Sequence, residues 1–548
     1  MKKQIFTILA LAGMAAGLSA QTVKSGNITA NETWSGEIVM DGAIFVKSGA
    51  TLTINAGTIV RGQPRTAAVQ ANVTTGTPGV LIVTQDGRIV ANGTSTNPII
   101  FTTAAVDNNN DGIPDDDDTN GFLDAWTSGD TFYDDAPKTA PLAPLAKDGN
   151  ANVALWGGMV ICGNAPTNLS NKDGVGYGKG IIEGLTVPGF PAADATYGGL
   201  LPHDNSGSLK FVSIRHAGDE IGSNNELNGI SLGGVGDGTV FENIEIYCNQ
   251  DDGIEWFGGT VNGKNLACFF IGDDSFDLDE GYTGSNQFVF AIMPFFNEND
   301  GDSYGSKSGD KAGEFDGLNG DDYSVRLKFN DVDADLTPWP LPNPEFFNTT
   351  LIGSTLVASP EFTPTSAASA NTGFNFIAGY AGSMYSAFVI NTGSAKGIVV
   401  STDTQGTEAG GAFSVVDNVN NGLVNVVSST FADVAAMGAN ENTVLANGDA
   451  IDQNYGGTAN VVNAGNTLVN EDVSFDPTGN AAGKLDSSLK ASPIDPRPAF
   501  AFSGVSGGAQ AQGFGLEGVT YRGAFSNTAS VLWTTGWTAL NTAGLLAD

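Results

Sequence analysis

The sequence has little positive charge, few cysteines and almost no histidine. It sets 23 Lys and Arg residues against 60 Asp and Glu residues, a formal net charge of −37 at pH 7. A field this negative attracts cations, Ca²⁺ first, and repels nucleic acid and anionic membranes, so we expect neither of these as a partner. Three cysteines, Cys162, Cys248 and Cys268, are too few for a disulfide framework, and we expect buried thiols. The two histidines, His203 and His216, exclude a zinc cluster built on several histidines.

Long hydrophobic runs are also scarce, and the most prominent one opens the sequence. Two lysines precede an apolar run over 5–18, and small residues at 19–20 come directly before Gln21. This order is typical of a secretory signal peptide, whereas a membrane anchor needs about 20 apolar residues. We therefore predict that 1–20 is a cleaved signal peptide. The mature chain is then secreted or attached to the cell surface and has no transmembrane segment.

What the sequence has in abundance is glycine, with 74 residues among 548, and short apolar stretches. Runs of Val, Ile, Leu, Phe and Thr end at Gly, Asn or Asp, as in 51–54 (TLTI) before 55–57 (NAG). Because tight corners consume glycine and asparagine, this pattern indicates strands joined by turns. A hydrophobic fraction of 41% is enough for a large core and excludes wholesale disorder.

The central part of the chain repeats itself with a period of 22 to 24 residues. The segment 228–232 (NGISL) recurs as 252–256 (DGIEW) and again as 274–278 (DSFDL). A strand-and-turn unit of this length without a helix is one coil of a parallel β-helix, in which each turn stacks on the last. In that register Cys248 and Cys268 lie two residues out of step on adjacent strands, about 8 Å apart and too far for a disulfide.

Two acidic segments interrupt the repeat, and on a solenoid such insertions project from one face and often form its binding surface. The tail, with Trp533 and Trp537 near its end, is expected to cap the open end of the core. We divide the chain into a signal peptide at 1–20, an N-terminal cap and first coils at 21–106, an acidic Ca²⁺-binding loop insertion at 107–150, the central β-helix at 151–295, an acidic loop region at 296–345, C-terminal coils at 346–490 and a C-terminal cap at 491–548.

Several motifs that carry a family resemblance lie along nearly the whole mature chain. They are 51–62 (TLTINAGTIVRG), 156–158 (WGG) with 163–166 (GNAP), 252–261 (DGIEWFGGTV) and 521–525 (YRGAF). In these motifs the chain resembles a family of secreted right-handed parallel β-helix surface proteins of Bacteroidetes and marine bacteria. The resemblance implies an all-β, right-handed parallel β-helix solenoid, the fold also used by pectate lyases and polygalacturonases, and an extracytoplasmic location. It carries over no catalytic residues.

The sharpest local motif is the acidic loop 107–118 (DNNNDGIPDDDD). Counted from its first residue, oxygen-bearing side chains fall at positions 1, 3, 5, 9 and 12, with glycine at position 6 and a main-chain carbonyl at position 7. This is the spacing of EF-hand-like loops, and the segment looks like the Ca²⁺ loops of thrombospondin type 3 repeats and dockerins. Position 12 is Asp rather than the longer Glu, and a solvated acidic loop is the alternative. The predicted Ca²⁺ ligands are Asp107, Asn109, Asp111, Ile113, Asp115 and Asp118.

A second concentration of acid lies on the repeats themselves. Two successive coils bring seven carboxylates into register: Asp251, Asp252, Glu255, Asp273, Asp274, Asp277 and Asp279. Carboxylates stacked about 5 Å apart repel one another, so bound Ca²⁺, raised pKa values or basic side chains must compensate. A pectate-lyase-like site would hold Ca²⁺ and use Lys264 or Arg215 as the base, and a polygalacturonase-like site would use paired Asp as acid and base. The catalytic candidates are Asp252, Glu255, Asp274 and Asp277, and capping of turn amides is the structural alternative.

Aromatic side chains and one histidine lie beside these acids in the sequence. Trp256, Tyr282 and Tyr304 are candidates for stacking on sugar rings, although core packing is the more common fate of such residues. His216, close to Asp219 in the sequence, is expected to be a surface residue without a catalytic role.

Together these features predict a secreted, Ca²⁺-binding β-helix protein of the bacterial surface that binds or scaffolds extracellular polysaccharide or matrix. The alternative is a polysaccharide lyase or glycoside hydrolase that acts on an acidic polysaccharide along the face carrying the four catalytic candidates. A basic side chain beside those acids in an aromatic-lined groove would favour the enzyme. A ladder satisfied by turn amides would favour the scaffold.

Overall fold

The structure is a computed structural model that describes the chain from residue 21 onward, with gaps. The described residues are 21–66, 77–110, 114–116, 122–134, 152–169, 174–176, 178–183, 185, 190–222, 225–293, 311–317, 343–353, 372–393, 398–400, 415, 418, 423–434, 467–469, 494–498, 511–513 and 515–548. The predicted signal peptide and large parts of the two acidic segments lie outside them.

Most coils contribute a short strand, or half of a longer one, to each of three parallel ladders, which we call A, B and C. Ladder A contains β2 (Glu32–Trp34), β4 (Thr51–Ile54), β7 (Arg88–Asn92), the first halves of β12 (Gly207–Arg215), β16 (Val240–Tyr247), β18 (Gly263–Phe269), β20 (Ser285–Ile292) and β22 (Glu345–Ile352), then β24 (Ser383–Tyr385) and β27 (Asn425–Val427). Ladder B contains the first halves of β1 (Thr22–Ile28) and β3 (Glu37–Val46), then β5 (Ile59–Gly62), β8 (Ile99–Thr103), the second halves of β12, β16, β18, β20 and β22, and β25 (Phe388–Gly393), β28 (Thr430–Val434) and β29 (Thr467–Val469). Ladder C contains the second halves of β1 and β3, then β6 (Val80–Val83), β9 (Gly158–Cys162), β15 (Ile230–Gly233), β17 (Ile254–Phe257), β19 (Phe276–Asp279), β21 (Lys311–Asp316), β23 (Thr372–Ile377) and β26 (Ile398–Val400).

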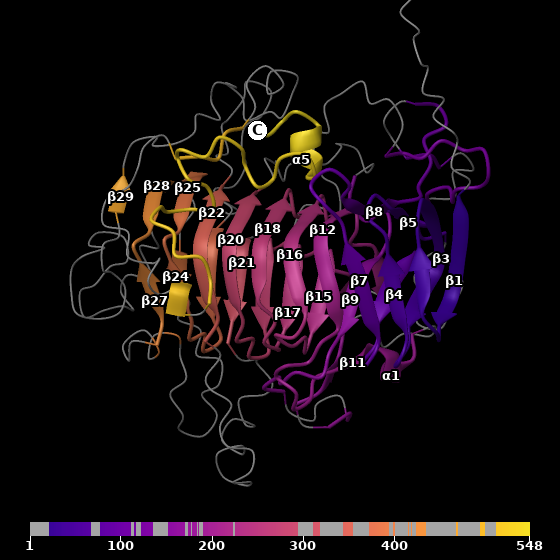
Figure 1. Cartoon of the computed structure of the whole chain (residues 1–548), viewed down its shortest axis with the longest axis horizontal. Coiled ribbons are helices and arrows are strands. Elements are labelled where there is room, and N and C mark those ends of the chain that lie inside the picture. The colour runs from indigo at the N-terminus through magenta and orange to yellow at the C-terminus, as the bar shows by residue number, and fades with distance from the viewer. Residues whose placement is uncertain are drawn as a thin grey trace, which may run out of the picture.

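These ladders make one sheet of 25 strands, which coils on itself from β1 to β29 (Figure 1). Two short antiparallel pairs lie outside it, β10 (Gly180–Ile181) with β11 (Thr196–Tyr197) and β13 (Glu220–Gly222) with β14 (Asn225–Glu226). The helices α1 (Ala192–Ala195) and α5 (Ala539–Thr542) are single turns. No helix in the described ranges is long and apolar enough to cross a membrane.

The register confirms the predicted repeat and fold class. Ile230 pairs with Ile254, and Ile254 pairs with Phe276, so successive units are 24 and 22 residues long as the sequence predicts. The offset of two residues between Cys248 and Cys268 is also confirmed, and all three cysteines are buried and form no disulfide. The chain is an all-β parallel β-helix.

Alternation along each strand separates the core from the outer faces. On β17, Ile254 and Trp256 lie in the central hydrophobic core, and on β16 so do Ile244 and Ile246. The residues between them therefore face outward, as period-two geometry requires. Each apolar side chain buried in this core stabilises the fold by roughly 1.5–3 kcal/mol before the entropy of ordering the chain is subtracted.

The bend from ladder A to ladder B is built the same way in every coil from β12 to β28. The residue at this bend has φ between 49° and 59° in seven successive coils: Phe211, Asn243, Asn265, Phe288, Asn348, Ser386 and Ser428. Asparagine tolerates this left-handed region better than most residues, and Asn265 Nδ2 also donates to Asn243 Oδ1 at 2.9 Å. The bend fixes where each strand breaks between the two ladders.

An insertion between β9 and β12 covers the outer face of ladder C in the first coils. Its apolar side chains Leu169, Ile182, Phe190 and Tyr197 pack in one cluster that reaches Phe257 of β17. At the edge of this cover, Tyr197 Oη donates to the carboxylate of Glu280 at 2.6 Å. The acidic residues of the next coils therefore begin where the apolar cover ends.

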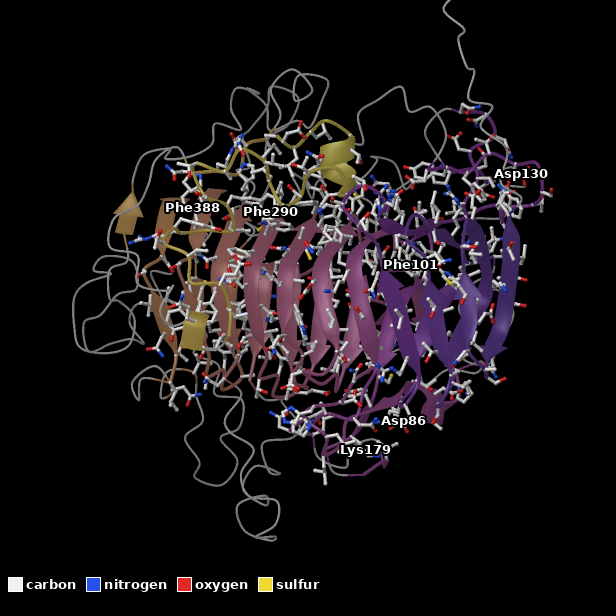
Figure 2. All side chains as sticks on the ribbon, viewed as in Figure 1. Asp86, Phe101, Asp130, Lys179, Phe290 and Phe388 are labelled. Carbon is white, nitrogen blue, oxygen red and sulfur yellow. The ribbon has the colours of Figure 1, made fainter. Side chains whose placement is uncertain are left out.

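Two segments differ from expectation. Strand β21 lies inside 296–345, which we expected to be a loop region, and it continues ladder C between β19 and β23. Residues 515–548, expected to cap the open end of the core, lie instead along the flank of the coils (Figure 1, yellow). The reason is the apolar outer face of ladder B, which this tail covers near Phe290 and Phe388 (Figure 2).

Candidate functional site

Acidic side chains stack in two columns where successive coils enter ladder C. The column on the strands themselves, which we call the strand column, contains Ser231, Glu255, Asp277, Glu314 and Asn375. The column just before the strands, which we call the corner column, contains Asn228, Asp252, Asp274 and Lys311, each two residues ahead of a strand residue paired in register. Parallel stacking spaces the members of a column by about 4.8 Å, so like charges face each other directly.

Asp252 lies at the centre of the acidic groups. Carboxylate oxygens of Asp252, Glu255 and Asp277 lie within 4.8 Å of one another. The same is true of Asp251, Asp252 and Asp273. Since Asp252 belongs to both groups, it would be a ligand of an ion bound in either of them.

Several buried oxygen atoms in the columns have no hydrogen-bond partner. The main-chain N–H of Asp274 donates to Asp252 Oδ1 at 2.9 Å, and the amide of Asn228 donates to the carboxylate of Glu255. The Oδ1 atoms of Asn228, Asp274 and Asp277 accept from no donor, although Asn228 is 2% exposed and Asp274 is 3% exposed. A buried acceptor left without a partner costs about 1–3 kcal/mol. A cation is the partner that such atoms fit.

Basic side chains lie at the two ends of the acidic region. Lys311 Nζ is 3.5 Å from Asp274 Oδ2 and 3.2 Å from Glu314 Oε2. Near the other end, the carbonyl oxygen of Asp219 accepts from the N–H of Leu227, next to Asn228, at 3.3 Å. Arg65 is 3.2 Å from Asp219 Oδ1 and, by opposing burial, limits the rise in the pKa of Asp219 to about 6.

Burial raises the pKa values of all four catalytic candidates, and neighbouring carboxylates raise them further. For Asp274, the charge of Lys311 acts in the opposite direction. For Glu255 and Asp277, the largest influences, burial and neighbouring carboxylates, all raise the pKa. The site therefore stabilises either bound protons or a bound cation.

The donor set fits a hard divalent cation. Its members are carboxylates and an amide oxygen, which Ca²⁺ and Mg²⁺ prefer, and they come from flexible corners and from strands of adjacent coils. Both groups that Asp252 joins contain only carboxylates, without cysteine or histidine. This composition disfavours zinc and copper.

The repeat in the sequence correctly predicted that these acids lie together, but it did not predict the basic residue beside them. Lys311 lies in a segment expected to be a loop, although 314–316 (EFD) repeats the pattern of 277–279 (DLD). The two predicted bases were wrong. Lys264 pairs with Glu517 at 2.5 Å, and Arg215 Nε donates to Ser213 Oγ at 2.8 Å, both away from ladder C.

The aromatic residues beside the acids belong to the core. Trp256 is fully buried and Tyr282 is 1% exposed, and their rings lie 5.3 Å apart. Neither can stack on a sugar, because each points to the interior from a strand or corner whose outer side chains are acidic. Tyr304 lies outside the described residues.

The predicted Ca²⁺ loop is described only in part. Asp107 is fully buried, Asp115 is 5% exposed, and Asp115 Oδ2 accepts from the N–H of Asn108 at 2.7 Å. Asn109 is exposed. Three of the predicted ligands lie outside the described residues: Asp111, Ile113 and Asp118. The Ca²⁺ site at 107–118 stays a prediction.

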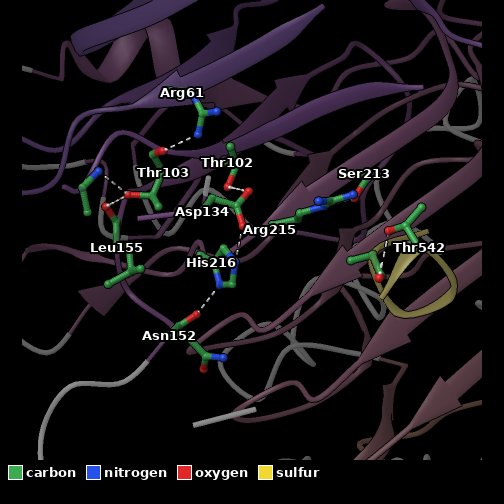
Figure 3. Close-up of polar contacts among 12 residues, drawn as sticks. Arg61, Thr102, Thr103, Asp134, Asn152, Leu155, Ser213, Arg215, His216 and Thr542 are labelled. Atoms are coloured by element: carbon green, nitrogen blue, oxygen red, sulfur yellow. Dashed lines mark hydrogen bonds and ion pairs between the residues drawn. The ribbon is translucent and has the colours of Figure 1, made fainter. Parts of the chain in front are cut away.

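His216 is buried rather than on the surface, because the insertion after β8 covers it (Figure 3). Its Nδ1 is 2.5 Å from the main-chain oxygen of Asn152, and its Nε2 is 3.5 Å from Asp134 Oδ1. The rings of Tyr133 and Tyr247 pack edge-on against it at 5.8 Å and 5.6 Å. These contacts give His216 a role in holding the insertion against the coils.

Comparison with known families agrees with this geometry. A family described as "Pectate-lyase like beta helix domain" matches residues 26–113 and 138–484. The chain belongs to this pectate-lyase-like β-helix family. The match includes both acidic columns and every strand from β2 to β29. No curated protein and no solved structure was found to match the chain.

Proposed function

We propose that this member of the pectate-lyase-like β-helix family is an exported protein that binds acidic polysaccharide through Ca²⁺ held on the acidic columns. One observation carries the proposal: the carboxylate of Asp252 joins two groups of acids, beside buried oxygens of Asp274 and Asp277 that have no donor. A bound Ca²⁺ would neutralise these acids and present open coordination positions to the carboxylate of a sugar acid.

The binding role is tested with the full mature chain and polygalacturonate as the probe. We expect retention on immobilised polygalacturonate in Ca²⁺ and loss of retention in excess chelator. Asp252→Asn should weaken binding at least tenfold, because both ion positions lose a ligand. Asp41→Asn serves as the control, because it changes an exposed acid on β3, in the first coils and outside both acidic columns. Retention that survives both the chelator and Asp252→Asn would sink the proposal.

Lys311 favours a second candidate function, that of a polysaccharide lyase. Its Nζ lies beside Asp274 and Glu314, which belong to the columns that would hold the ion and its sugar carboxylate. With its amine neutral, Lys311 would take the proton from the carbon next to that carboxylate. The electrons of the broken C–H bond would form a carbon–carbon double bond as the bond to the neighbouring sugar oxygen breaks, and that oxygen would leave with the proton from the lysine ammonium. Unsaturated product measured by its ultraviolet absorbance tests this activity. Lys311→Gln should abolish product and keep Ca²⁺-dependent retention, while Lys264→Gln should change neither.

Export rests on the N-terminal segment, whose charge and apolar run are those of a signal peptide. Expression in a bacterial host should release a mature chain that begins at Gln21. N-terminal sequencing of the exported protein checks the cut. Retention of the segment in the cell envelope would instead favour an anchor.

A further inference from the structure

The C-terminal residues 515–548, which we call the strap, lie across the flank of the coils without joining their ladders. The strap has one element of its own, the single turn α5, and a bridge from Leu546 to Ile494. Strands β16, β18, β20 and β22 each pair with the strand before and the strand after them. The strap can therefore leave this flank without breaking a hydrogen bond between coils.

Side chains of the coils recognise the main chain of the strap. Gln287 accepts from the N–H of Glu517 and donates to its carbonyl oxygen, both at 2.8 Å. Asn348 Nδ2 donates to the carbonyl oxygen of Tyr521 at 2.8 Å. Thr350 Oγ1 accepts from a main-chain N–H of the strap in the same way. Three polar side chains that project from β20 and β22 thus bind peptide groups, as a peptide-binding face does.

A buried carboxylate holds the other end of the strap. Glu245 on β16 is fully buried, and its two oxygens accept from the N–H of Ala539 at 2.8 Å and 2.9 Å. Ser213 Oγ donates to the same carboxylate at 2.5 Å. In its outward column Glu245 lies between Ser213 and Ala267, so the strap supplies its main-chain donor.

Aromatic anchors complete the contact. Phe525 is 2% exposed and packs edge-on against Phe290 at 4.9 Å. Trp537 is fully buried and packs edge-on against Phe211 of β12 at 5.7 Å. The apolar side chains beneath would form a large exposed patch without the strap, so the face favours a bound peptide over water.

We propose that the flank formed by β12, β16, β18, β20 and β22 is a peptide-binding face, and that the strap is its ligand. The strap is bound within the chain and can dissociate while the coils stay folded. The ligand class is a peptide that folds in turns and bends and has the aromatic spacing of 525–537. This inference does not rest on the acidic columns or on the proposed function.

Hydrogen exchange on the unaltered protein is the first test. The amides of Gly523, Ala524 and Ala539 should exchange together and faster than the ladder amides of β16 and β18, because opening of the strap costs less than unfolding of a coil. Exchange of these three amides at the rate of the coil amides would overturn the proposal.

The second test uses full-length variants and a labelled synthetic peptide of residues 515–548. Ala539→Pro removes the N–H that Glu245 accepts, and Thr538, at φ −81° and ψ 149°, already has the backbone that a following proline requires. We expect this variant to bind at least tenfold more labelled peptide than the unaltered chain, whose tethered strap competes at high effective concentration.

Ala539→Gly keeps the N–H and is the matched control, which should take up as little peptide as the unaltered chain. A peptide of the same composition in scrambled order should bind neither protein. If Ala539→Pro keeps its coil amides protected and still takes up no peptide, the face is not a binding site. If that variant fails to fold, hydrogen exchange on the unaltered chain decides the question.

Discussion

Ladder B and ladder C of the same coils carry opposite chemistry on their outer faces. On ladder B one outward column begins with Ser213 and Glu245, whose carboxylate the strap satisfies, and continues through Ala267, Phe290 and Thr350 under the strap. On ladder C the strand column contains Glu255 and Asp277, and burial raises the pKa values of both carboxyls. Stacking in register places similar outward side chains next to each other in successive coils. Apolar neighbours therefore stabilise each other by contact, whereas neighbouring carboxylates repel each other. One face is stabilised by protein, and the other requires protons or cations.

The largest expected effect comes from opening the apolar column. Phe290 is fully buried and contacts Phe269 at 5.2 Å and Phe525 at 4.9 Å. Phe290→Ala should lower the free energy of unfolding by about 3–5 kcal/mol, measured by chemical denaturation, because it leaves a cavity that the strap cannot fill. Val531→Ala, at a strap residue that is 62% exposed, should change it by less than about 0.5 kcal/mol. Similar values for both variants would show that the column under the strap contributes no more to stability than an exposed strap residue does.

The acidic columns should make the metal-free protein less stable as the pH rises. Burial raises the carboxyl pKa values of Asp252, Glu255, Asp274 and Asp277 above those of the unfolded chain. Between the two values the folded chain holds more protons, so its stability is greatest below the unfolded pKa values and decreases as the pH rises. In chelator, the melting temperature should fall from about pH 5 to about pH 8.

Added Ca²⁺ should remove most of that fall, because the ion takes the place of the protons. Thermal melts with and without Ca²⁺ at both pH values measure the effect. A melting temperature in chelator that rises across the same window would contradict the assignment of the columns as a cation site.

Removing the charge of a single carboxylate should show separately how much the acids repel one another and how much they contribute to metal binding. Asp277→Asn keeps the shape of the side chain and removes one of the stacked charges. We expect the metal-free protein to gain up to about 1 kcal/mol in stability, and Ca²⁺ affinity measured by calorimetry to fall at least tenfold. Changes of the same sign in stability and affinity would show that Asp277 supports the fold rather than an ion.

The smallest effect should come from an acid outside both regions. Glu242 lies on β16, three residues before Glu245, and pairs with Lys210 at 2.9 Å in a half-exposed position. Glu242→Gln should change the free energy of unfolding by less than about 0.5 kcal/mol, and leave Ca²⁺ affinity unchanged. A larger loss of stability would mean that a charge on this strand matters even where water reaches it.

The sequence predicted the elements that repeat. The recurrence of 228–232 at 252–256 and 274–278 predicts both the coil and the register that brings Asp252 near Asp277. A slip of one residue would turn the apolar side chains of a parallel strand outward, and the repeat length fixes the register among the remaining alternatives. A short repeat is therefore enough to place the outward side chains.

Features that arise only from packing were not predictable in this way. Lys311 enters the site through a strand of six residues, β21, whose partner lies 37 positions earlier, outside the repeat length. The strap has no period at all, and its place depends on an apolar flank that is visible only once ladder B is formed. His216 is buried for the same reason, since the segment that covers it folds back from a non-repeating insertion.

The left-handed residue at the bend between ladders A and B acts as a stop against slippage. If a strand shifted by one position, Val212, Ile244 or Val289 would have to adopt positive φ, which β-branched side chains strongly resist. The same shift would turn every outward residue of that coil inward. Seven successive coils share the bend. A register shift in one coil would therefore force the same unfavourable φ on the next coil if that coil followed it. The bend thus favours the correct register in each of these coils as the solenoid forms.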